Sequence, residues 1–349
     1  MNGSERAERV ARYAEEVVSR DELVSLLETN DHPTAYIGFE PSGYLHIGSL
    51  LVPSLTINAM LDEGFSVTIL LADWHALIND KLGGNIGKIR ECGRYMADAF
   101  AFACRNRPGL KFAFATELVG ESDYWAELIR NAKCASLQRL KRAMTIMGRN
   151  EDEAELDSSK LLYPLMQVTD IFRLGVDVAY AGMDQRRAHM LAREVAEASG
   201  RSKPIAIHTP LLSSLKSTSR MDVAVSKMSK SDPGSAIYVH DSEETINVKL
   251  KKAFCPREAH GNPVLDICKY IILPYTGKLE IHRDSKYGGD AVFTAFEPLV
   301  ESYSKGELHP ADLKNGVGSG LWQILRPFHE HYTDDTSLLE WMKSVEVTR

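Results

Sequence analysis

The chain has 349 residues, which is too long for one typical hydrophobic core, and its 44% hydrophobic content supplies apolar side chains for about two domains. The net charge of -7 argues against a protein that coats nucleic acid nonspecifically, because such proteins carry a basic excess. A specific RNA binder can still concentrate positive charge locally.

Cysteine usage and hydropathy argue against three further classes of protein. The 5 cysteines are widely spaced and include no Cys-x-x-Cys pair, so neither a zinc site nor a disulfide framework is indicated. The longest uncharged stretch, residues 41–61, is interrupted by Pro, Ser, His and Asn, and residues 1–6 lack a signal-type apolar run. We therefore expect a soluble, cytoplasmic protein with no membrane partner.

The first clear pattern is a strand, a turn and a helix. Residues 35–39 are apolar, residues 40–43 have turn composition, and residues 47–63 form a largely apolar helical stretch. His46 is therefore expected at a helix N-terminus, where unpaired backbone NH groups and the macrodipole favour an anion. Gly48 would let a ligand approach the backbone, and a donating His46 would add a hydrogen bond to a phosphate oxygen.

Strands and helices then alternate along the chain. Alternation of this kind implies an α/β fold with a doubly wound parallel sheet, whose ligands bind beyond the carboxyl ends of the strands. Glu40, residues 73–75 and residues 181–185 fall near such ends. The strands are expected near residues 35–39, 66–72, 111–115, 176–180 and 204–208, and the helices near residues 47–63, 86–104, 123–148, 159–173 and 185–199.

Tyr163, Gln167 and Asp170 lie four and then three residues apart in a predicted helix, so their side chains share one face. One ligand could meet all three. Composition alone would favour core packing for Tyr163, solvent exposure for Gln167 and a helix-surface position for Asp170.

Two basic stretches flank this helix. A solvated helix face explains most such runs, and contact with phosphates or bases is the alternative. The stretches contain Lys133, Arg139, Lys141, Arg142 and Arg149, and then Arg186, Arg187 and Arg193.

Lys227-Met228-Ser229-Lys230-Ser231 reads as a loop that carries two ammonium groups among hydroxyl side chains. A polar segment, residues 213–220, leads into it. Such a loop could close over a pyrophosphate, whereas a solvated loop is the plain alternative. The rest of the chain is predicted to be a helical bundle with few strands, and its helices are expected near residues 243–254, 263–273, 311–328 and 337–345.

These elements together resemble a class I aminoacyl-tRNA synthetase. His46-Ile47-Gly48-Ser49 is close to the HIGH signature, and the loop from Lys227 to Ser231 matches the KMSKS signature letter for letter. Further segments are similar to tyrosyl-tRNA synthetases of the archaeal and eukaryotic kind, and the likeness runs from about residue 35 to about residue 328. These segments are residues 36–43, 71–75, 163–168 and 182–186.

The resemblance implies a tyrosine–tRNA ligase with a Rossmann-like catalytic domain. Attack of the tyrosine carboxylate on the α-phosphate of ATP would give tyrosyl-adenylate, and the tyrosyl group would then pass to the terminal ribose of tRNA(Tyr). Catalysis would rest on positioning and on stabilisation of phosphate charge by His46, Lys227, Lys230 and Mg²⁺. The implied ATP-binding residues are Gly48, Ser49, Met228, Ser229 and Ser231.

The same resemblance implies an amino-acid pocket. Tyr36 and Asp170 would hold the substrate phenol, for which a buried carboxylate is a natural acceptor, and phenylalanine would leave that acceptor unpaired. Tyr163, Gln167 and Gln185 would contact the substrate amino group. Leu70 and His75 would only line the pocket.

Contacts to tRNA are implied at two places. Arg142, Arg186 and Arg187 would face the first base pair and the discriminator base of the acceptor end. Tyr287, His309 and Asp312 would take up the anticodon by stacking and by accepting hydrogen bonds from a base, although a capped helix start also explains residues 309–312.

The implied organisation has three parts and forms a homodimer. The catalytic domain would comprise residues 1–225, with a dimer-forming insertion near residues 115–150. The KMSKS-type loop and a linker would comprise residues 226–240, and a helical anticodon-binding domain residues 241–349.

Ser49 departs from the signature, which has a second histidine at that position, and we expect it to tune the rate rather than abolish activity. Two alternatives stay open. A tryptophan–tRNA ligase is disfavoured by Tyr36 and Asp170, because an indole NH can be met by a neutral amide and offers Tyr36 no phenolic oxygen. A catalytically silent RNA-binding paralogue is permitted by Ser49, but the intact KMSKS-type loop argues against it.

Overall fold

A computed structural model describes residues 2–147, 157–216, 228 and 234–340. The described residues group into two compact units, one formed by residues 2–43 and 53–210 and the other by residues 44–52 and 211–340. Within these described ranges, no helix combines the length and the hydropathy that a membrane crossing requires.

The first unit is built on a six-stranded sheet with the order β1-β6-β5-β2-β3-β4. Its five parallel strands confirm the predicted alternation, and the chain order reverses between β2 and β5. In doubly wound sheets a binding crevice forms outside the carboxyl ends of the strands at such a reversal. These strands are β2 (Thr34–Phe39), β3 (Ser66–Leu71), β4 (Leu110–Phe114), β5 (Val178–Gly182) and β6 (Ile205–Thr209).

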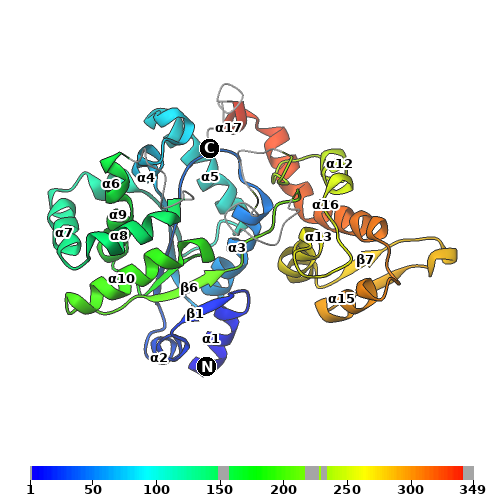
Figure 1. Ribbon diagram of the computed structural model, residues 1–349, viewed down its shortest axis with the longest axis horizontal. Helices are drawn as coiled ribbons and strands as arrows, with labels where there is room; N and C mark the ends of the chain where they lie inside the picture. Colours follow the sequence, from blue (N-terminus) through cyan, green and yellow to red (C-terminus); the bar gives the residue numbers. More distant parts are fainter. Residues whose placement is uncertain (1, 148–156, 217–227, 229–233, 341–349) are drawn as a thin grey trace. The chain divides into compact units, whose positions relative to one another are not determined.

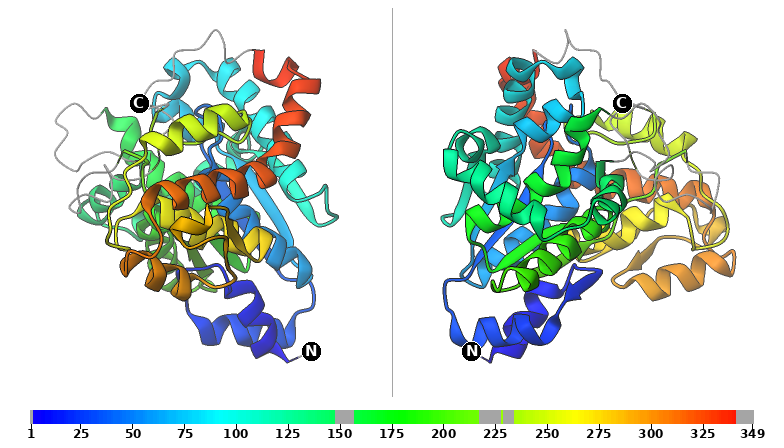
Figure 2. Two further views of the ribbon diagram at one scale, coloured as in Figure 1. Left: turned by 90° about the vertical axis from the view of Figure 1, so that its right-hand side faces the viewer. Right: turned by 60° about the vertical axis from the view of Figure 1, so that its left-hand side comes forward.

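The edge strand β1 (Glu16–Val18) was not predicted. It pairs antiparallel with β6, so that Glu16 lies opposite His208. Three residues are too few for an alternating hydrophobic pattern, and the strand forms through pairing with β6. It connects α1 (Gly3–Ala11) and α2 (Arg20–Thr29), which lie together at the N-terminal end of the chain in Figure 2.

Helices cover both faces of this sheet. Figure 1 shows α3 (Ile47–Asp62) and α5 (Ile86–Ala103) on one side and α9 (Leu162–Leu174) and α10 (Arg186–Ala198) on the other. Most apolar residues of β2, β3, β5 and β6 are buried between the two layers, whereas those of the edge strand β4 are half-buried. Shorter elements complete the unit: α4 (Asp73–Ile78), η1 (Lys81–Gly84), α6 (Ala115–Val119), η3 (Ser158–Leu161) and η4 (Met183–Gln185).

The single helix predicted for residues 123–148 is wrong. The segment forms α7 (Ser122–Lys133), α8 (Leu137–Ala143) and the 3₁₀ turn η2 (Met144–Met147). The break has a local cause, because the Ser136 hydroxyl accepts a hydrogen bond from the Arg139 backbone NH at 3.2 Å and starts a new helix.

The second unit is mostly helical, as predicted, but it also contains the short hairpin of β7 (Leu279–Ile281) and β8 (Ala291–Phe293). Its long helix α16 (Pro310–Asp334) packs closely on β7 because Gly316 has no side chain: a Cβ there would lie 2.9 Å from the Glu280 carbonyl oxygen. The other elements are α12 (Glu243–Lys252), α13 (Pro263–Ile267), the π-helical η5 (Cys268–Ile272), α14 (Leu273–Thr276), η6 (Ser285–Tyr287), α15 (Phe296–Ser304) and α17 (Ser337–Glu340).

Candidate active site

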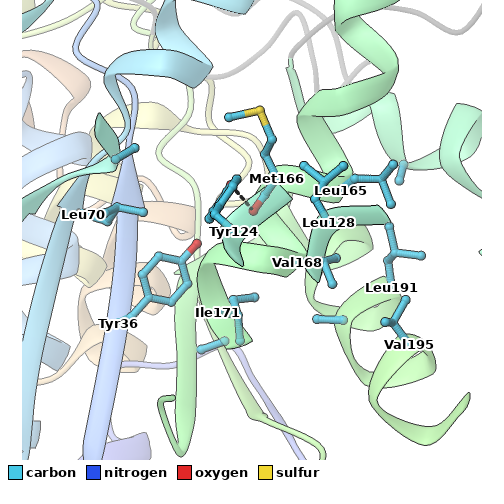
Figure 3. Close-up of a cluster of buried hydrophobic side chains, with 14 of the residues drawn as sticks. Tyr36, Leu70, Tyr124, Leu128, Leu165, Met166, Val168, Ile171, Leu191 and Val195 are labelled. Atoms are coloured by element: carbon cyan, nitrogen blue, oxygen red, sulfur yellow. Dashed lines mark hydrogen bonds between the residues drawn. The ribbon is translucent and has the colours of Figure 1, made fainter. Parts of the chain in front are cut away.

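The residues predicted to hold a phenol meet where β2 faces α9. Tyr36 on β2 is 2% exposed and Asp170 on α9 is 1% exposed, so the helix-surface alternative for Asp170 is wrong. Figure 3 shows the Tyr36 hydroxyl directed toward α9 and Tyr124, with Leu70 on the neighbouring strand. We call this group, together with Tyr163, Gln167 and Gln185, the tyrosine pocket, after the ligand that the sequence predicts for it.

Tyr124 is a member of this pocket that the sequence did not reveal. Its hydroxyl donates to Asp170 Oδ1 at 2.7 Å and lies 3.3 Å from the Met166 carbonyl oxygen, the contact drawn in Figure 3. Tyr124 comes from α7, and no spacing or motif links it to α9 along the chain. The hydrogen bond fixes the orientation of the carboxyl group.

Burial controls the protonation of this cluster. It raises the pKa of Asp170 to about 7, although the Tyr124 hydrogen bond acts in the opposite direction. Burial, and then the Asp170 carboxylate, raises the pKa of Tyr36, whose hydroxyl therefore stays protonated. An acceptor and a protonated hydroxyl placed side by side suit a phenol, which can donate to one and accept from the other.

His75 lies beside Asp170, with 3.2 Å between its Nε2 and Asp170 Oδ2. The two atoms do not have hydrogen-bonding geometry, and both ring nitrogens lack a hydrogen-bond partner among the described residues. Burial lowers the pKa of His75 to about 4, so the contact is not an ion pair at neutral pH. His75 is thus a neutral ring beside Asp170, and its lining role stays a prediction.

The two glutamines form an oriented pair. Gln185 donates through Nε2 to the Ile146 carbonyl oxygen at 3.1 Å, which turns its Oε1 toward Gln167 Nε2 at 3.4 Å. Gln167 Oε1 is then buried and has no hydrogen-bond partner among the described residues, although the side chain lies close enough to Tyr36 to moderate the rise in that pKa. A buried acceptor without a donor is unfavourable, so this atom is suited to an ammonium or amide NH of a ligand.

The Tyr163 hydroxyl is oriented by the carboxylate of Glu40, a residue with no predicted role beyond its position near the end of a strand. This hydroxyl donates to Glu40 Oε1 at 2.7 Å, and Asn79 Nδ2 donates to the same carboxylate at 3.1 Å. Burial, and then Glu40, raises the pKa of Tyr163. Because the hydroxyl proton points to Glu40, the Tyr163 oxygen can accept from a cation.

The second unit contains the start of α3, where His46 caps the helix. His46 Nδ1 accepts from the backbone NH groups of Gly48 at 3.1 Å and Ser49 at 3.2 Å, and the Ile47 NH donates to the Ile237 carbonyl oxygen. The expectation that these NH groups would bind an anion is therefore wrong, since they are already paired. The same contact makes Nε2 the protonated nitrogen of a neutral His46 and thus a donor.

Gly48 and Ser49 hold this cap in place. A Cβ at position 48 would lie 3.2 Å from His46 Nδ1, so glycine leaves room for the ring. The Ser49 hydroxyl donates to the His46 carbonyl oxygen at 3.0 Å and accepts from the His46 NH at 3.0 Å. Ser49 thus closes a reciprocal cap on His46, as in a capping box.

Met228, the one residue of the KMSKS-type loop that the structure describes, is hydrogen-bonded near this cap. Met228 is 4% exposed, and its NH donates to the Leu212 carbonyl oxygen at 3.0 Å. A Cβ at position 48 would lie 3.3 Å from Leu212 Cβ, so Leu212 joins the two signature motifs. We call His46, Gly48, Ser49, Leu212 and Met228 the nucleotide corner. Lys227, Ser229, Lys230 and Ser231 lie outside the described residues.

Arginines from α8 and α10 surround a hollow of about 510 Å³ in the first unit. Arg142 and Arg187 are exposed there, and Arg187 Nη1 donates to Thr145 Oγ1 at 2.8 Å. Arg186 makes a bidentate contact with Glu16, at 2.7 Å for Nε to Oε2 and 2.9 Å for Nη2 to Oε1. The structure therefore brings the three predicted acceptor-end residues together in one positively charged surface, with Arg139 paired to Glu194 at its rim.

The predicted anticodon residues differ in their local roles. Tyr287 is 63% exposed in η6, between β7 and β8. His309 Nδ1 accepts from the Ala311 NH at 3.1 Å, which confirms that His309 caps the start of the helix. The rest of its ring is exposed and remains accessible. Asp312 is half-buried in the first turn of α16.

No group of three or more His, Cys, Asp or Glu side chains among the described residues could hold a metal ion. The five cysteines are free thiols.

Known proteins resemble this chain over nearly its whole length. Residues 28–326 match the family model described as tRNA synthetases class I (W and Y). A tyrosine–tRNA ligase of Picrophilus torridus is 50% identical over 328 residues, which cover 93% of this chain and 98% of that protein. A tyrosine–tRNA ligase of Aeropyrum pernix is 45% identical over an alignment of 358 positions, gaps included, which covers 99% of this chain and 98% of that protein.

A solved structure supports the same relationship. The crystal structure of a tyrosyl-tRNA synthetase complexed with L-tyrosine from Pyrococcus horikoshii is 40% identical, has a TM-score of 0.93 and covers 99% of this chain and 100% of that chain. This likeness confirms the predicted doubly wound sheet with its helical C-terminal part. The chain thus belongs to the class I tRNA synthetases of the tryptophan and tyrosine family and, within that family, to the tyrosine–tRNA ligases.

Proposed function

We propose that the tyrosine pocket selects L-tyrosine for activation by ATP and transfer to tRNA(Tyr). The observation that carries this proposal is the Asp170 carboxyl group, which is 1% exposed and oriented by Tyr124. A substrate phenol would donate to Asp170 and accept from Tyr36. Phenylalanine has no donor for this position and would leave the buried acceptor unpaired, whereas the indole NH of tryptophan offers the Tyr36 hydroxyl no oxygen to donate to.

The other end of the pocket suits the substrate ammonium group. Gln167 Oε1 is a buried acceptor without a donor, and the Tyr163 oxygen is turned to accept because its proton goes to Glu40. Gln185 supports Gln167 by accepting from its Nε2. Together these groups would fix the amino acid by its two polar ends and leave its carboxylate for reaction.

The chemical step needs charge stabilisation on the phosphates. An oxygen of the tyrosine carboxylate attacks the α-phosphorus, the bond from that phosphorus to the bridging oxygen breaks, and pyrophosphate leaves with the electron pair. The Nε2–H of His46 would donate to a phosphate oxygen. Mg²⁺ would arrive with ATP as its counter-ion, and Lys227 and Lys230 would act on the leaving pyrophosphate.

The arginine hollow would receive the acceptor end of tRNA(Tyr). We call Arg142, Arg186 and Arg187 the acceptor-end surface.

The helical part, residues 241–349, would bind the anticodon, with the exposed Tyr287 ring as a stacking platform beside His309 and Asp312. Tyrosine, ATP and tRNA meet in the cytoplasm, which is where we place this activity.

We further propose that residues 115–150 join two copies of the chain. Three large apolar side chains of this segment are exposed: Trp125 at 41%, Ile129 at 61% and Leu137 at 57%. Exposed apolar side chains gathered in one segment are typical of an interface. Sedimentation analysis of Ile129→Glu should then show monomers, while Val248→Glu, at a 48% exposed position on α12, should remain dimeric. Dimers in both variants would contradict this interface.

Amino-acid-dependent ATP–pyrophosphate exchange tests the proposed pocket. Tyrosine, tryptophan and phenylalanine are compared at equal concentrations. Exchange with tyrosine alone supports the pocket and the adenylate mechanism together. Exchange with tryptophan would remove Asp170 as the selecting residue, and no exchange in folded protein would favour an RNA-binding role without catalysis.

A further inference from the structure

A line of four polar side chains connects the first unit's edge strand to the acceptor-end surface. Arg186, the first residue of α10, donates to the Glu16 carboxylate on β1 through both Nε and Nη2. Glu16 Oε2 lies 3.0 Å from His208 Nδ1 on β6, and His208 Nε2 lies 3.0 Å from His189 Nδ1 on α10. Side chains of β1, β6 and α10 thereby form one connected line that ends at the Arg186 guanidinium.

The hydrogen bonds of this line converge on Glu16. Burial lowers the pKa of both histidines, to about 3 for His189, and the Arg186 hydrogen bond lowers the pKa of Glu16. Neutral imidazoles beside an ionised carboxylate require that His208 donates through Nδ1 to Glu16 and that His189 donates through Nδ1 to His208. Glu16 therefore accepts from both sides, which restricts its rotation.

Because the Glu16 carboxylate cannot rotate freely, the Arg186 side chain that it binds is restricted as well. Glu16 binds Nε and Nη2, so the opposite edge of the guanidinium, with Nη1, faces away from the carboxylate. The Arg186 side chain is 43% exposed and lines the hollow, whereas Glu16 is 28% exposed and His208 is fully buried. A flexible arginine loses considerable rotamer freedom when it binds, and a fixed carboxylate removes that freedom beforehand.

We propose that Glu16, itself held by His208, is the positioning residue that sets the Arg186 guanidinium for the acceptor end of tRNA. The inference rests on the proposed tRNA role of the acceptor-end surface and adds a residue of the N-terminal segment to it. Glu16 touches neither tyrosine nor the phosphates in this assignment. Its loss acts on tRNA binding and leaves adenylate formation intact.

The α10 helix offers a matched control. Glu22 on α2 makes the same kind of bidentate contact with Arg193, at 2.8 and 3.0 Å, but neither residue lines the hollow. Glu22→Gln therefore weakens the contact of the N-terminal segment with Arg193 of α10 but leaves the contact with Arg186 unchanged. If the N-terminal segment only needs to be held against α10, this variant should show the same defect as Glu16→Gln.

The test compares tRNA charging with ATP–pyrophosphate exchange in Glu16→Gln, Arg186→Ala, the double variant and Glu22→Gln. We expect Glu16→Gln to raise the KM for tRNA about tenfold with little change in kcat or in exchange, as befits a charge-assisted pair. The double variant should equal Arg186→Ala, and Glu22→Gln should match the unchanged chain.

The outcomes separate this inference from the proposed function. An unchanged KM in Arg186→Ala would remove Arg186 from the acceptor-end surface, and the inference with it. A raised KM in Arg186→Ala together with an unchanged or lowered KM in Glu16→Gln would overturn only the positioning role. An equal rise in Glu22→Gln, or a parallel loss of exchange in Glu16→Gln, would also overturn it, because the effect would then be structural.

Discussion

The tyrosine pocket and the nucleotide corner hold their polar groups in opposite ways. In the pocket, side chains pair with side chains from distant segments, as Tyr124 does with Asp170. In the corner, His46 and Ser49 pair with backbone groups within three residues. Under the proposed function, the pocket would gain selectivity from buried groups that only the right ligand satisfies. The corner would use a local cap to direct one donor, the Nε2–H of His46, at ATP, which is the same for all synthetases.

The largest expected effect lies in the corner. His46→Asn keeps an acceptor for the helix cap but removes the Nε2 donor, so the exchange rate should fall by about 10²- to 10³-fold with little change in the KM for tyrosine. His46→Ala should lose the same rate and, in addition, about 1 kcal/mol of stability in thermal or denaturant unfolding. Near-normal exchange in His46→Asn would show that the cap, and not the donor, is what the reaction needs.

The pocket should respond through selectivity. Asp170→Ala removes the phenol acceptor, so kcat/KM for tyrosine in the exchange assay should fall about 10²-fold, while that for phenylalanine changes little. Asp21→Asn, at an exposed position on α2, is the matched control and should change neither value. If both amino acids lost activity equally in Asp170→Ala, the carboxyl group would be structural and not selective.

The raised pKa of Asp170 predicts that the KM for tyrosine depends on pH. Below about 7 the free carboxyl group takes up a proton, which a donating phenol must displace, so the KM for tyrosine should rise by at most about tenfold per pH unit as the pH falls. The neighbouring groups support this assignment: His75 and Tyr124 are neutral in this range, and the carboxylate of Asp73 helps to raise the Asp170 pKa. Asp170→Asn should flatten the profile, and an unchanged slope in that variant would assign it to another group.

The raised pKa of Asp170 also predicts how the stability of the folded chain changes with pH. The folded chain binds the Asp170 proton more tightly than the unfolded chain, whose carboxyl has a pKa near 3.8. This residue therefore makes folding less favourable as the pH rises from about 4 to about 7. Asp170→Asn should gain stability relative to the parent chain over that interval, as measured by denaturant unfolding.

Ser49 should give the smallest effect. Ser49→Ala removes two hydrogen bonds to the His46 backbone but leaves Nδ1 of His46 as the cap, so we expect a loss of about tenfold or less in exchange rate. Ser49→His restores the signature residue, and the parent chain should lie within about 10³-fold of that variant. A larger gap would contradict the expectation that Ser49 only tunes the rate.

Much of the fold follows from short-range patterns. The parallel strands were predicted within about two residues, because apolar runs bounded by Gly, Pro and polar turns are local signals. The break at Ser136, the three-residue β1 and the hairpin of β7 and β8 were missed. Each of these is too short for a periodic pattern and depends on one cap or on pairing with a neighbour.

Local patterns in the chain were enough to find the two signature motifs and the order of strands and helices. They also placed Tyr163, Gln167 and Asp170 on one helix face, because spacing along a helix sets which side chains share a face. The hydrogen-bond partners of these side chains depend on the tertiary fold. Tyr124 reaches Asp170 across 46 positions and Glu16 reaches Arg186 across 170, and no local pattern encodes contacts between segments that meet only when the core closes. The orientation of each polar group, and hence what the site can accept or donate, comes from those long-range contacts.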